Sequence, residues 1–252
     1  MNQKRRSQII KMLEEQSVVT NRELMDAFGI SIETVRRDLA YLEQKGVLER
    51  VYGGAVRKEM LREELIYSSR EQKEAEEKQK IAEVTEKLIQ NNDIVFFDIG
   101  TTVHYVVKKL NAGKKISAFT NAIRTAVTLS EKGSEVILTG GRIRSGELAL
   151  SGSLAENNLR NFNIDKAIIS VAGITEDGVS DFFADEAGLR RQAISNANKV
   201  IVLADYTKFG VRAACRVCEI EDIDVLITDS KAPKSLLKKF ENKGVQVIIA
   251  DL

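Results

Sequence analysis

Hydrophobic residues recur with two different spacings along the chain. Within residues 1–50 they recur every three or four positions, as at Ile9, Met12 and Leu13, which is typical of amphipathic helices. From Ile94 onward, short and continuous apolar runs alternate with helical patterns. The sequence therefore predicts a small helical domain followed by a larger domain of alternating strands and helices.

Capping signals divide the first domain into three helices. Thr20 and Glu23 have the spacing of a capping box at the start of a second helix, which Gly29 is expected to end. Ser31 is expected to cap a third helix that ends near Gly46. Two helices separated only by Gly29, Ile30 and Ser31 predict a helix-turn-helix.

The third helix carries the side chains expected to read DNA. Val35, Leu39 and Leu42 form one inward-facing stripe when residues are spaced at about 100° each. Arg37 lies on the opposite face, where it can reach base edges in a major groove and bond guanine bidentately. Arg36 lies on the flank and is better placed for phosphate, which carries no sequence information.

A β wing is predicted directly after this helix. Residues 47–52 alternate like a strand, and a Gly-Gly pair then turns the chain into residues 55–57. Residues 1–58 carry eleven basic and eight acidic side chains, a net charge of +3, whereas the remainder carries −2. This asymmetry, with the wing, favours DNA binding over a protein-interaction module with surface arginines. The residues expected to contact DNA are Arg22, Ser31, Thr34, Arg36, Arg37, Arg50, Tyr52 and Arg57.

Seven apolar runs of the second domain are predicted to be strands. Most are continuous rather than alternating, as expected where helices cover both faces of a sheet. The fold class is therefore α/β, with a doubly wound and mainly parallel sheet behind the N-terminal winged helix-turn-helix. The runs are Ile94–Phe97, Lys115–Phe119, Glu135–Leu138, Ala167–Val171, Val200–Leu203, Val225–Ile227 and Val245–Ile249.

Small, glycine-rich and hydroxyl-bearing residues follow several of these strands. Ligands of open α/β sheets bind at the carboxyl ends of strands, where backbone N–H groups and helix N-termini favour an anion. Thr101 and Thr102 open such a helix, and Lys208 can offer a positive charge to a phosphate. Any one of these loops fits an ordinary βα turn, but several at one edge favour an anionic small-molecule site.

The chain resembles the DeoR family of bacterial transcriptional regulators. The DNA-binding signature of that family is similar to residues 30–39, 42–46 and 52–55. Its effector domain is similar to several later segments, including residues 98–102 and 204–210, so the resemblance covers most of the chain. The resemblance implies a body with a fold similar to sugar-phosphate isomerases, which senses phosphorylated sugars.

The resemblance also implies which residues bind the effector. Glu186 is included because it matches a recurring Glu-Ala pair of the family. One departure is that Thr175 follows Gly173 and Ile174, where the family pattern has Asp, which leaves the role of that loop open. The implied effector-binding residues are Asp98, Gly100, Thr101, Thr102, Thr120, Asn121, Gly140, Gly141, Glu186 and Lys208.

Composition excludes several other classes of protein. No apolar run approaches the roughly 18 residues of a membrane span, and the start lacks the apolar stretch of a secretory signal, so a cytoplasmic protein is expected. Cys215, Cys218 and His104 are too few for a structural zinc site, and each is expected to be an ordinary packed or surface residue. We expect neither a metal nor a cofactor.

These features predict a repressor of a sugar-metabolism operon that a phosphorylated sugar releases. Residues 1–57 are expected to bind double-stranded operator DNA, residues 58–74 to form a linker, and residues 75–252 to bind the effector. The body is also expected to form a homo-oligomer, a dimer or tetramer, because paired heads read two half-sites. The alternative is a sugar-phosphate isomerase-like enzyme with an attached DNA-binding head, whereas an architectural DNA protein would leave the large body unexplained.

Overall fold

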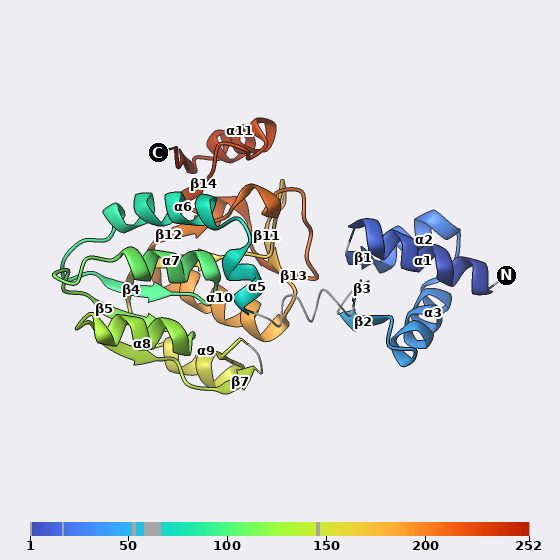
Figure 1. Cartoon of the computed structure of the whole chain (residues 1–252), viewed down its shortest axis with the longest axis horizontal. Helices are drawn as coiled ribbons and strands as arrows, with labels where there is room; N and C mark the ends of the chain where they lie inside the picture. Colours follow the sequence, from blue (N-terminus) through green and yellow to red (C-terminus); the bar gives the residue numbers. More distant parts are fainter. Residues whose placement is uncertain (1, 17, 52–53, 58–66, 145–146, 252) are drawn as a thin grey trace. The chain divides into compact units, whose positions relative to one another are not determined.

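The computed structural model describes residues 2–16, 18–51, 54–57, 67–144 and 147–251. Its internal contacts divide the chain into two compact units, Met1–Ser69 and Arg70–Leu252 (Figure 1). Over the described ranges, no helix has both the length and the apolar character needed to cross a bilayer.

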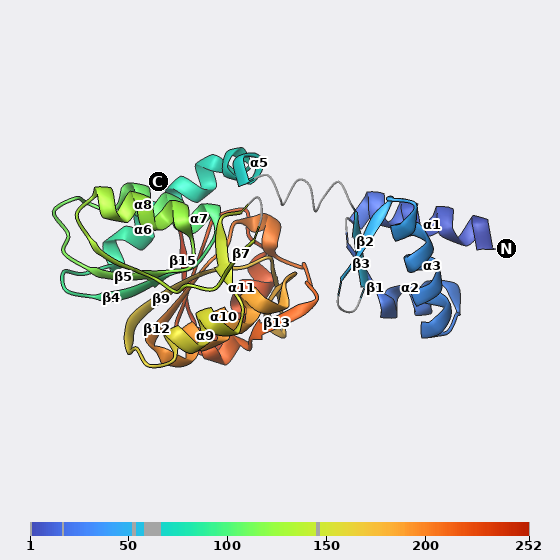
Figure 2. The same ribbon diagram turned by 90° about the horizontal axis from the view of Figure 1, so that it is seen from below.

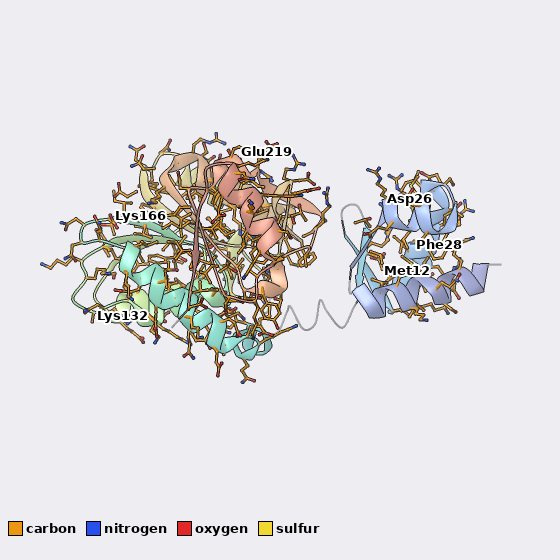
Figure 3. The ribbon with its side chains drawn as sticks, turned by 90° about the horizontal axis from the view of Figure 1, so that it is seen from above. Met12, Asp26, Phe28, Lys132, Lys166 and Glu219 are labelled. Carbon is orange, nitrogen blue, oxygen red and sulfur yellow. The ribbon has the colours of Figure 1, made fainter. Side chains whose placement is uncertain are left out.

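The N-terminal unit is a winged helix-turn-helix, as predicted. Its elements are α1 (Asn2–Gln16), β1 (Val18–Thr20), α2 (Asn21–Phe28), α3 (Ile32–Gln44), β2 (Leu48–Val51) and β3 (Gly54–Arg57). Leu13, Leu24 and Leu39, one from each helix, are buried in a single core, against which Met12 and Phe28 pack (Figure 3). The sheet order is β1-β3-β2, and the sequence pattern did not indicate β1, which adds a third strand to the wing.

The predicted helix ends are confirmed, except for the cap at Ser31. Thr20 Oγ1 accepts from the backbone N–H of Glu23 at 3.1 Å, and Glu23 Oε2 accepts from the backbone N–H of Thr20 at 2.7 Å. Gly29 takes the left-handed conformation, with φ of 60°, that ends α2. Ser31 stands at the N-cap of α3, but its hydroxyl contacts the Thr34 hydroxyl at 3.1 Å instead of a backbone N–H. The prediction that the Ser31 side chain caps α3 was therefore wrong, because its hydroxyl bonds the Thr34 hydroxyl and no backbone N–H of the first turn.

The second unit is built on a parallel seven-stranded sheet, so the predicted doubly wound α/β fold is confirmed. Its strands are β4 (Ile94–Phe97), β5 (Ser117–Thr120), β6 (Glu135–Leu138), β9 (Ile164–Ser170), β12 (Ala197–Leu203), β14 (Val225–Thr228) and β15 (Gln246–Ile249). They lie in the order β15-β14-β12-β9-β4-β5-β6. Each predicted run is one of these strands, with its ends shifted by at most a few residues.

Helices cover both faces of this sheet (Figure 2). One face carries α6 (Ala75–Leu88), α7 (Thr101–Lys109) and α8 (Ile123–Glu131), and the other carries α9 (Ser153–Leu159), α10 (Ala184–Asn196) and α11 (Lys234–Asn242). Phe97 and Ile168 are buried in the core of the first face, whereas their neighbours Phe96 and Ile169 are buried in that of the second. Because successive side chains point to opposite faces, both of which are covered, the strands are apolar throughout.

The sequence analysis did not predict two small antiparallel units, because their strands mix polar with apolar residues and contain no continuous apolar run. They are the hairpin β7 (Arg142–Arg144) with β8 (Ala149–Ser151), and the sheet of β10 (Gly173–Thr175), β11 (Gly178–Asp181) and β13 (Cys215–Cys218). Cys218 is buried in the core and Cys215 is half-buried, and both thiols are free. Residues three apart on a strand point to opposite faces, so this Cys-x-x-Cys is a pair of packed residues.

The predicted linker, residues 58–74, contains a helix, α5 (Tyr67–Gln72). Residues 58–66 lie outside the described residues. Helix α6 begins at Ala75, where the first helix of the body was expected.

Candidate functional site

Helix α3 presents two neighbouring arginines with different surroundings. Arg37 is exposed and has no ion-pair partner among the described residues. Arg36 is also exposed, but its Nη1 lies 3.0 Å from Glu33 Oε1 on the preceding turn. Within the described part of the chain, the guanidinium of Arg37 therefore has no competing carboxylate, whereas that of Arg36 is paired with Glu33.

A buried carboxylate fixes α3 against α1. Asp38 is 1% exposed and accepts from Arg5 Nε at 2.6 Å and from Arg6 Nε at 2.7 Å. The Arg6 guanidinium also lies 3.7 Å from the centre of the Tyr41 ring. Asp38 follows Arg37 directly, so this ion-pair cluster holds the backbone from which the Arg37 side chain extends.

Of the other predicted DNA contacts, Ser31 and Thr34 lie at the start of α3, and the remaining described ones lie on α2 and the wing. Arg22 is exposed on α2 with Asp26 as a loose partner at 3.9 Å (Figure 3). Arg50 of β2 donates from its backbone and from Nε to the Glu43 carboxylate, at 2.9 and 2.8 Å, and these bonds lower the pKa of Glu43. Arg57 ends strand β3, and Tyr52 lies outside the described residues.

In the second unit, the strand order reverses between β4 and β9. The chain runs outward from β4 to β5 and β6 on one side, and from β9 to β12, β14 and β15 on the other. At such a switch point the carboxyl ends of the strands open a ligand crevice. Residues 98–102 follow β4, and a Cβ added to Gly100 would lie 2.2 Å from Oγ of Ser170, which ends β9. Glycine is required there because the two strand ends meet so closely.

Asp98 lies at this switch point and is held by buried charges. It is fully buried and accepts from the Ser170 backbone N–H and hydroxyl, each at 3.1 Å, and from Arg190 Nε at 2.6 Å. Arg190 Nη1 also lies 2.5 Å from Asp181 Oδ2. Burial raises the pKa of Asp98, and the Arg190 charge opposes that shift. Asp98 Oδ1 is buried with no partner among the described residues, so it can accept a hydrogen bond from a ligand hydroxyl.

Glu186 joins the same cluster from the first turn of α10. Its Oε1 lies 2.7 Å from Arg144 Nε, and its Oε2 lies 3.7 Å from Arg190 Nη2. With Asp98 and Asp181, the cluster holds three carboxyl groups against two guanidiniums. Burial, together with repulsion from Asp181, raises the pKa of Glu186 to about 7. A proton on Glu186 would make the cluster neutral.

Glu186→Gln should remove a pH dependence of stability. Because the pKa of Glu186 is raised from 4.5 to about 7, the folded protein keeps a proton that the unfolded chain loses. The free energy of unfolding of the wild type should therefore fall, by about 1–3 kcal/mol, as pH rises through this window. Urea titrations of both proteins at several pH values measure the difference. Asp185→Asn, one residue away and exposed, should keep the wild-type profile; an identical fall in Glu186→Gln would contradict the assignment.

The turns after β5 and β6 lie on the β4 side of the switch point. Asn121 is 1% exposed, and neither atom of its side-chain amide has a partner among the described residues. Thr120 is buried, and its hydroxyl accepts from the backbone N–H two residues on at 3.1 Å. Gly140 and Gly141 have positive φ, and a Cβ on Gly141 would lie 2.6 Å from the Ser151 carbonyl oxygen. Thr120, Gly140 and Gly141 shape the turns, whereas Asn121 offers unused donors and an acceptor.

Lys208 lies two strands away from Asp98, in the turn after β12. It is half-buried, and its backbone N–H donates to the Asp205 carbonyl at 3.1 Å. The turn is held by Gly210, whose N–H donates to the Ile174 carbonyl at 2.8 Å, so strand β10 positions it. With neighbouring strands about 4.8 Å apart, the ends of β12 and β4 are separated by roughly 10 Å. The structure brings Asp98 and Glu186 into one cluster but leaves Lys208 outside it.

A pocket of about 390 Å³ lies between the β7–β8 hairpin and the start of α10. It is lined by Arg142, Arg144, Ser151, Phe183, Ala184, Asp185 and Glu186. The Arg144 guanidinium lies 4.0 Å from the centre of the Phe183 ring, and Arg142 Nη2 lies 3.0 Å from Asp185 Oδ2. Glu186 connects this pocket to the buried cluster at the switch point.

Sequence reasoning missed the partners that organise this cluster. Arg190 stands four residues after Glu186 on one helix face, which was a usable signal of an ion pair. Its contact with Asp98, 92 residues away, had no signal in the sequence. The contacts of Arg144 and Asp181 could not be predicted, because the strands that carry them, β7 and β11, were not predicted either.

His104 is a packed residue of the body. It is 7% exposed on α7, lies 3.5 Å from the Thr125 hydroxyl, and has its pKa lowered to about 4 by burial. Across the described part of the chain, no group of three or more His, Cys, Asp or Glu side chains is placed to hold a metal ion.

Two family models match the chain, one for each unit. The DeoR-like helix-turn-helix domain matches residues 5–60, and the DeoR C terminal sensor domain matches residues 73–230. Full-length relatives include the HTH-type transcriptional regulator GolR of Listeria innocua, which is 34% identical over 98% of both chains. The HTH-type transcriptional repressor GlcR of Bacillus subtilis is 32% identical over 96% of this chain and 94% of its own. The glycerol-3-phosphate regulon repressor of Escherichia coli is 30% identical over 96% and 97%.

Solved structures show a weaker likeness. The probable sor operon regulator of Shigella flexneri is 13% identical, with a TM-score of 0.44 over 71% of this chain and 97% of that chain. Ribose 5-phosphate isomerase A of Methanocaldococcus jannaschii is 14% identical, with a TM-score of 0.39 over 52% and 53%.

Proposed function

The chain belongs to the DeoR family of transcriptional regulators, and on that premise we propose that it is a cytoplasmic repressor of a sugar-metabolism operon, released by a phosphorylated sugar. Asn121 carries the effector part of this proposal. Its amide is buried beside the switch point without a partner among the described residues, and such a group costs about 1–3 kcal/mol unless something bonds it. A sugar hydroxyl would bond it, and would bond Asp98 Oδ1 in the same crevice.

The names of the relatives support a repressor that responds to a phosphorylated compound. Two of those named above are repressors, and one controls a glycerol-3-phosphate regulon. They are named as regulators rather than enzymes, which disfavours the isomerase alternative. A dimer or larger homo-oligomer belongs to the proposal because paired heads gain affinity and specificity on two half-sites.

Contacts of α5 and α6 support a route from effector to head. Arg70 of α5 forms an ion pair with Glu147, which is 1% exposed and lies beside the β7–β8 hairpin. Glu71 accepts from Lys108 Nζ on α7, the helix that begins at the crevice. Helix α5 is therefore fixed to elements on the β4 side of the switch point.

The same segment is fixed to the turn that carries Lys208. The Tyr206 hydroxyl donates to Glu74 Oε1 at 3.2 Å. Lys78 is 5% exposed, donates to the carbonyl oxygens of Arg70 and Lys73, and has its pKa lowered to about 8 by burial. A ligand that drew the two sides of the switch point together would strain these contacts, and the predicted DNA-binding domain precedes them directly in the chain.

Sugar phosphate should weaken operator binding by about 5- to 150-fold, and operator DNA should weaken sugar-phosphate binding by the same factor. The measurement is fluorescence anisotropy on an operator that the protein selects from random duplexes. A panel of pentose and hexose phosphates is titrated beside the unphosphorylated sugars, all at one ionic strength because phosphate contacts are salt-dependent.

Lys208→Ala serves as the test variant and Lys238→Ala, an exposed lysine on α11, as its matched control. Lys208→Ala should bind operator normally and ignore the sugar phosphate, while Lys238→Ala should behave as the wild type. Release of DNA from both variants at the same concentrations would mean that the anion competes at the head, and the proposed two-domain switch would be wrong.

A further inference from the structure

Exposed apolar side chains gather at one edge of the seven-stranded sheet. Among the described residues nine large hydrophobic side chains are exposed, and six of them come from α8, β6, β7, α9 and the turn after α9. They are Val127, Ile137, Leu138, Ile143, Leu154 and Phe162, between 38% and 59% exposed. In Figure 1, α8, α9 and β7 lie along the side of the body opposite α11. We call this set of six side chains the edge patch.

Contacts beneath the edge patch show that it is continuous around β6. Ile137 pairs in register with Phe119 on β5, and the Phe119 and Phe162 rings lie 4.5 Å apart. Asn158 of α9 donates at 2.9 Å to the carbonyl oxygen that follows β6, and Leu154 lies one turn earlier on the same helix face. Apolar atoms therefore extend from the edge strand onto α9, and Val127 on α8 and Leu138 add to them from the opposite face.

Strand β6 has no partner on its outer side among the described residues. It ends the strand order and pairs with β5 alone. An exposed edge presents unpaired backbone N–H and C=O groups, and proteins usually protect it with Lys, Pro or a bulge. Here one charged residue, Glu135, stands at the start of the strand, and Val136, Ile137 and Leu138 follow. A long-lived partner on this edge would bury both the apolar side chains and the free backbone groups.

Charges around β6 are arranged to complement a second copy of the same surface. Exposed Glu131 and Glu135 lie at the amino end of β6, since Glu131 ends α8 and α8 runs antiparallel to the strand. Exposed Arg124, near the start of α8, lies at the carboxyl end, and so does Arg142, which begins β7 and already pairs with exposed Asp185 at 3.0 Å. Two copies related by a two-fold axis, with their β6 strands antiparallel, would place the acidic end of each against the basic end of the other.

We propose that the edge patch around β6 is the surface through which two copies of this chain form a dimer. That the partner is a second copy of this chain rests on the proposed function, in which each chain carries one DNA-reading helix and two DNA-binding domains are needed to read two half-sites. The charge arrangement and the open strand edge fit the same partner independently.

Leu138→Lys tests the proposal in the full chain without DNA. A two-fold axis would place this lysine in the interface twice, so the dissociation constant of the dimer should rise by about 100-fold or more. Sedimentation velocity over a range of micromolar concentrations should give a mass for the wild type of at least two chains, and half that mass for the variant. Leu154→Lys, on α9, should act in the same way and decides the question if Leu138→Lys fails to fold, as checked by circular dichroism.

Ile249→Lys is the matched control. Ile249 is 43% exposed, as Leu138 is, and belongs to β15 at the other edge of the same sheet. It should leave the sedimenting mass unchanged. The proposal is overturned if the wild type is a monomer, if the folded edge-patch variants keep the wild-type mass, or if Ile249→Lys separates the copies equally well. Because no DNA or sugar is present, a failure of the proposed regulatory function would not change these results.

Discussion

Arg37→Ala should abolish selective binding to the operator. A bidentate arginine–guanine contact is worth about 1–3 kcal/mol, and a two-headed assembly would lose it twice, about 2–6 kcal/mol in all. The structural reason is that Arg37 is exposed on α3 without an ion-pair partner among the described residues, while Asp38 next to it is fixed by Arg5 and Arg6. The variant should therefore fold normally and lose the contact alone. Titrations on the selected operator and on random duplex DNA measure the loss.

Arg36→Ala is the matched control on the same helix. Arg36 pairs with Glu33 and is predicted to contact phosphate, so its removal should weaken operator and random DNA by similar factors. If Arg37→Ala instead weakened both DNAs equally, or left operator affinity unchanged, α3 would not read bases through this residue.

Arg190→Met should destabilise the body by about 3–5 kcal/mol, because removing one partner of a buried ion pair leaves uncompensated charge. Arg190 contacts Asp98 and Asp181 at 2.6 and 2.5 Å, and Asp98 is fully buried. Methionine keeps much of the side-chain volume, so the loss reports the charge rather than a cavity. Urea unfolding of the full chain, followed by circular dichroism, gives the difference in free energy.

Arg191→Met provides the comparison. Arg191 is exposed on the next position of α10 and donates to the Arg216 carbonyl oxygen at 2.6 Å. It should cost no more than about 1 kcal/mol, as surface substitutions usually do. Equal stability of Arg190→Met and wild type would mean that the buried carboxyl groups are protonated or hydrated without Arg190, and the switch-point cluster would need a different account.

Local signals in the sequence determined the two domains and most of their elements. The capping box at Thr20 and Glu23 and the stripe through Val35 and Leu39 predicted the head, because helix ends and helix faces are properties of a few consecutive residues. The continuous apolar runs predicted every strand of the large sheet. Because all carboxyl ends of a parallel sheet meet at one edge, the same runs also predicted a shared edge for the turns that follow them.

Only the tertiary structure decided which charges share a site. Asp98, Asp181, Glu186 and Arg190 come from two strand ends and one helix, and their contacts span up to 92 residues. Spacing along a sequence carries no information about such pairs unless they lie within one turn of a helix. For the same reason the role of Lys208 stays a prediction, since its distance from the cluster depends on how far apart β4 and β12 lie.

Strand β6 shows most clearly the difference between what the sequence determined and what the tertiary structure decided. Its run of Val136, Ile137 and Leu138 is as apolar as the runs in the centre of the sheet, and the sequence pattern predicted a buried strand with equal justification for each. The strand order places β6 at the edge, where Ile137 and Leu138 are exposed. Hydrophobic periodicity determines that a segment forms a strand, because pleating is local; whether that strand is covered depends on which neighbours the rest of the chain provides.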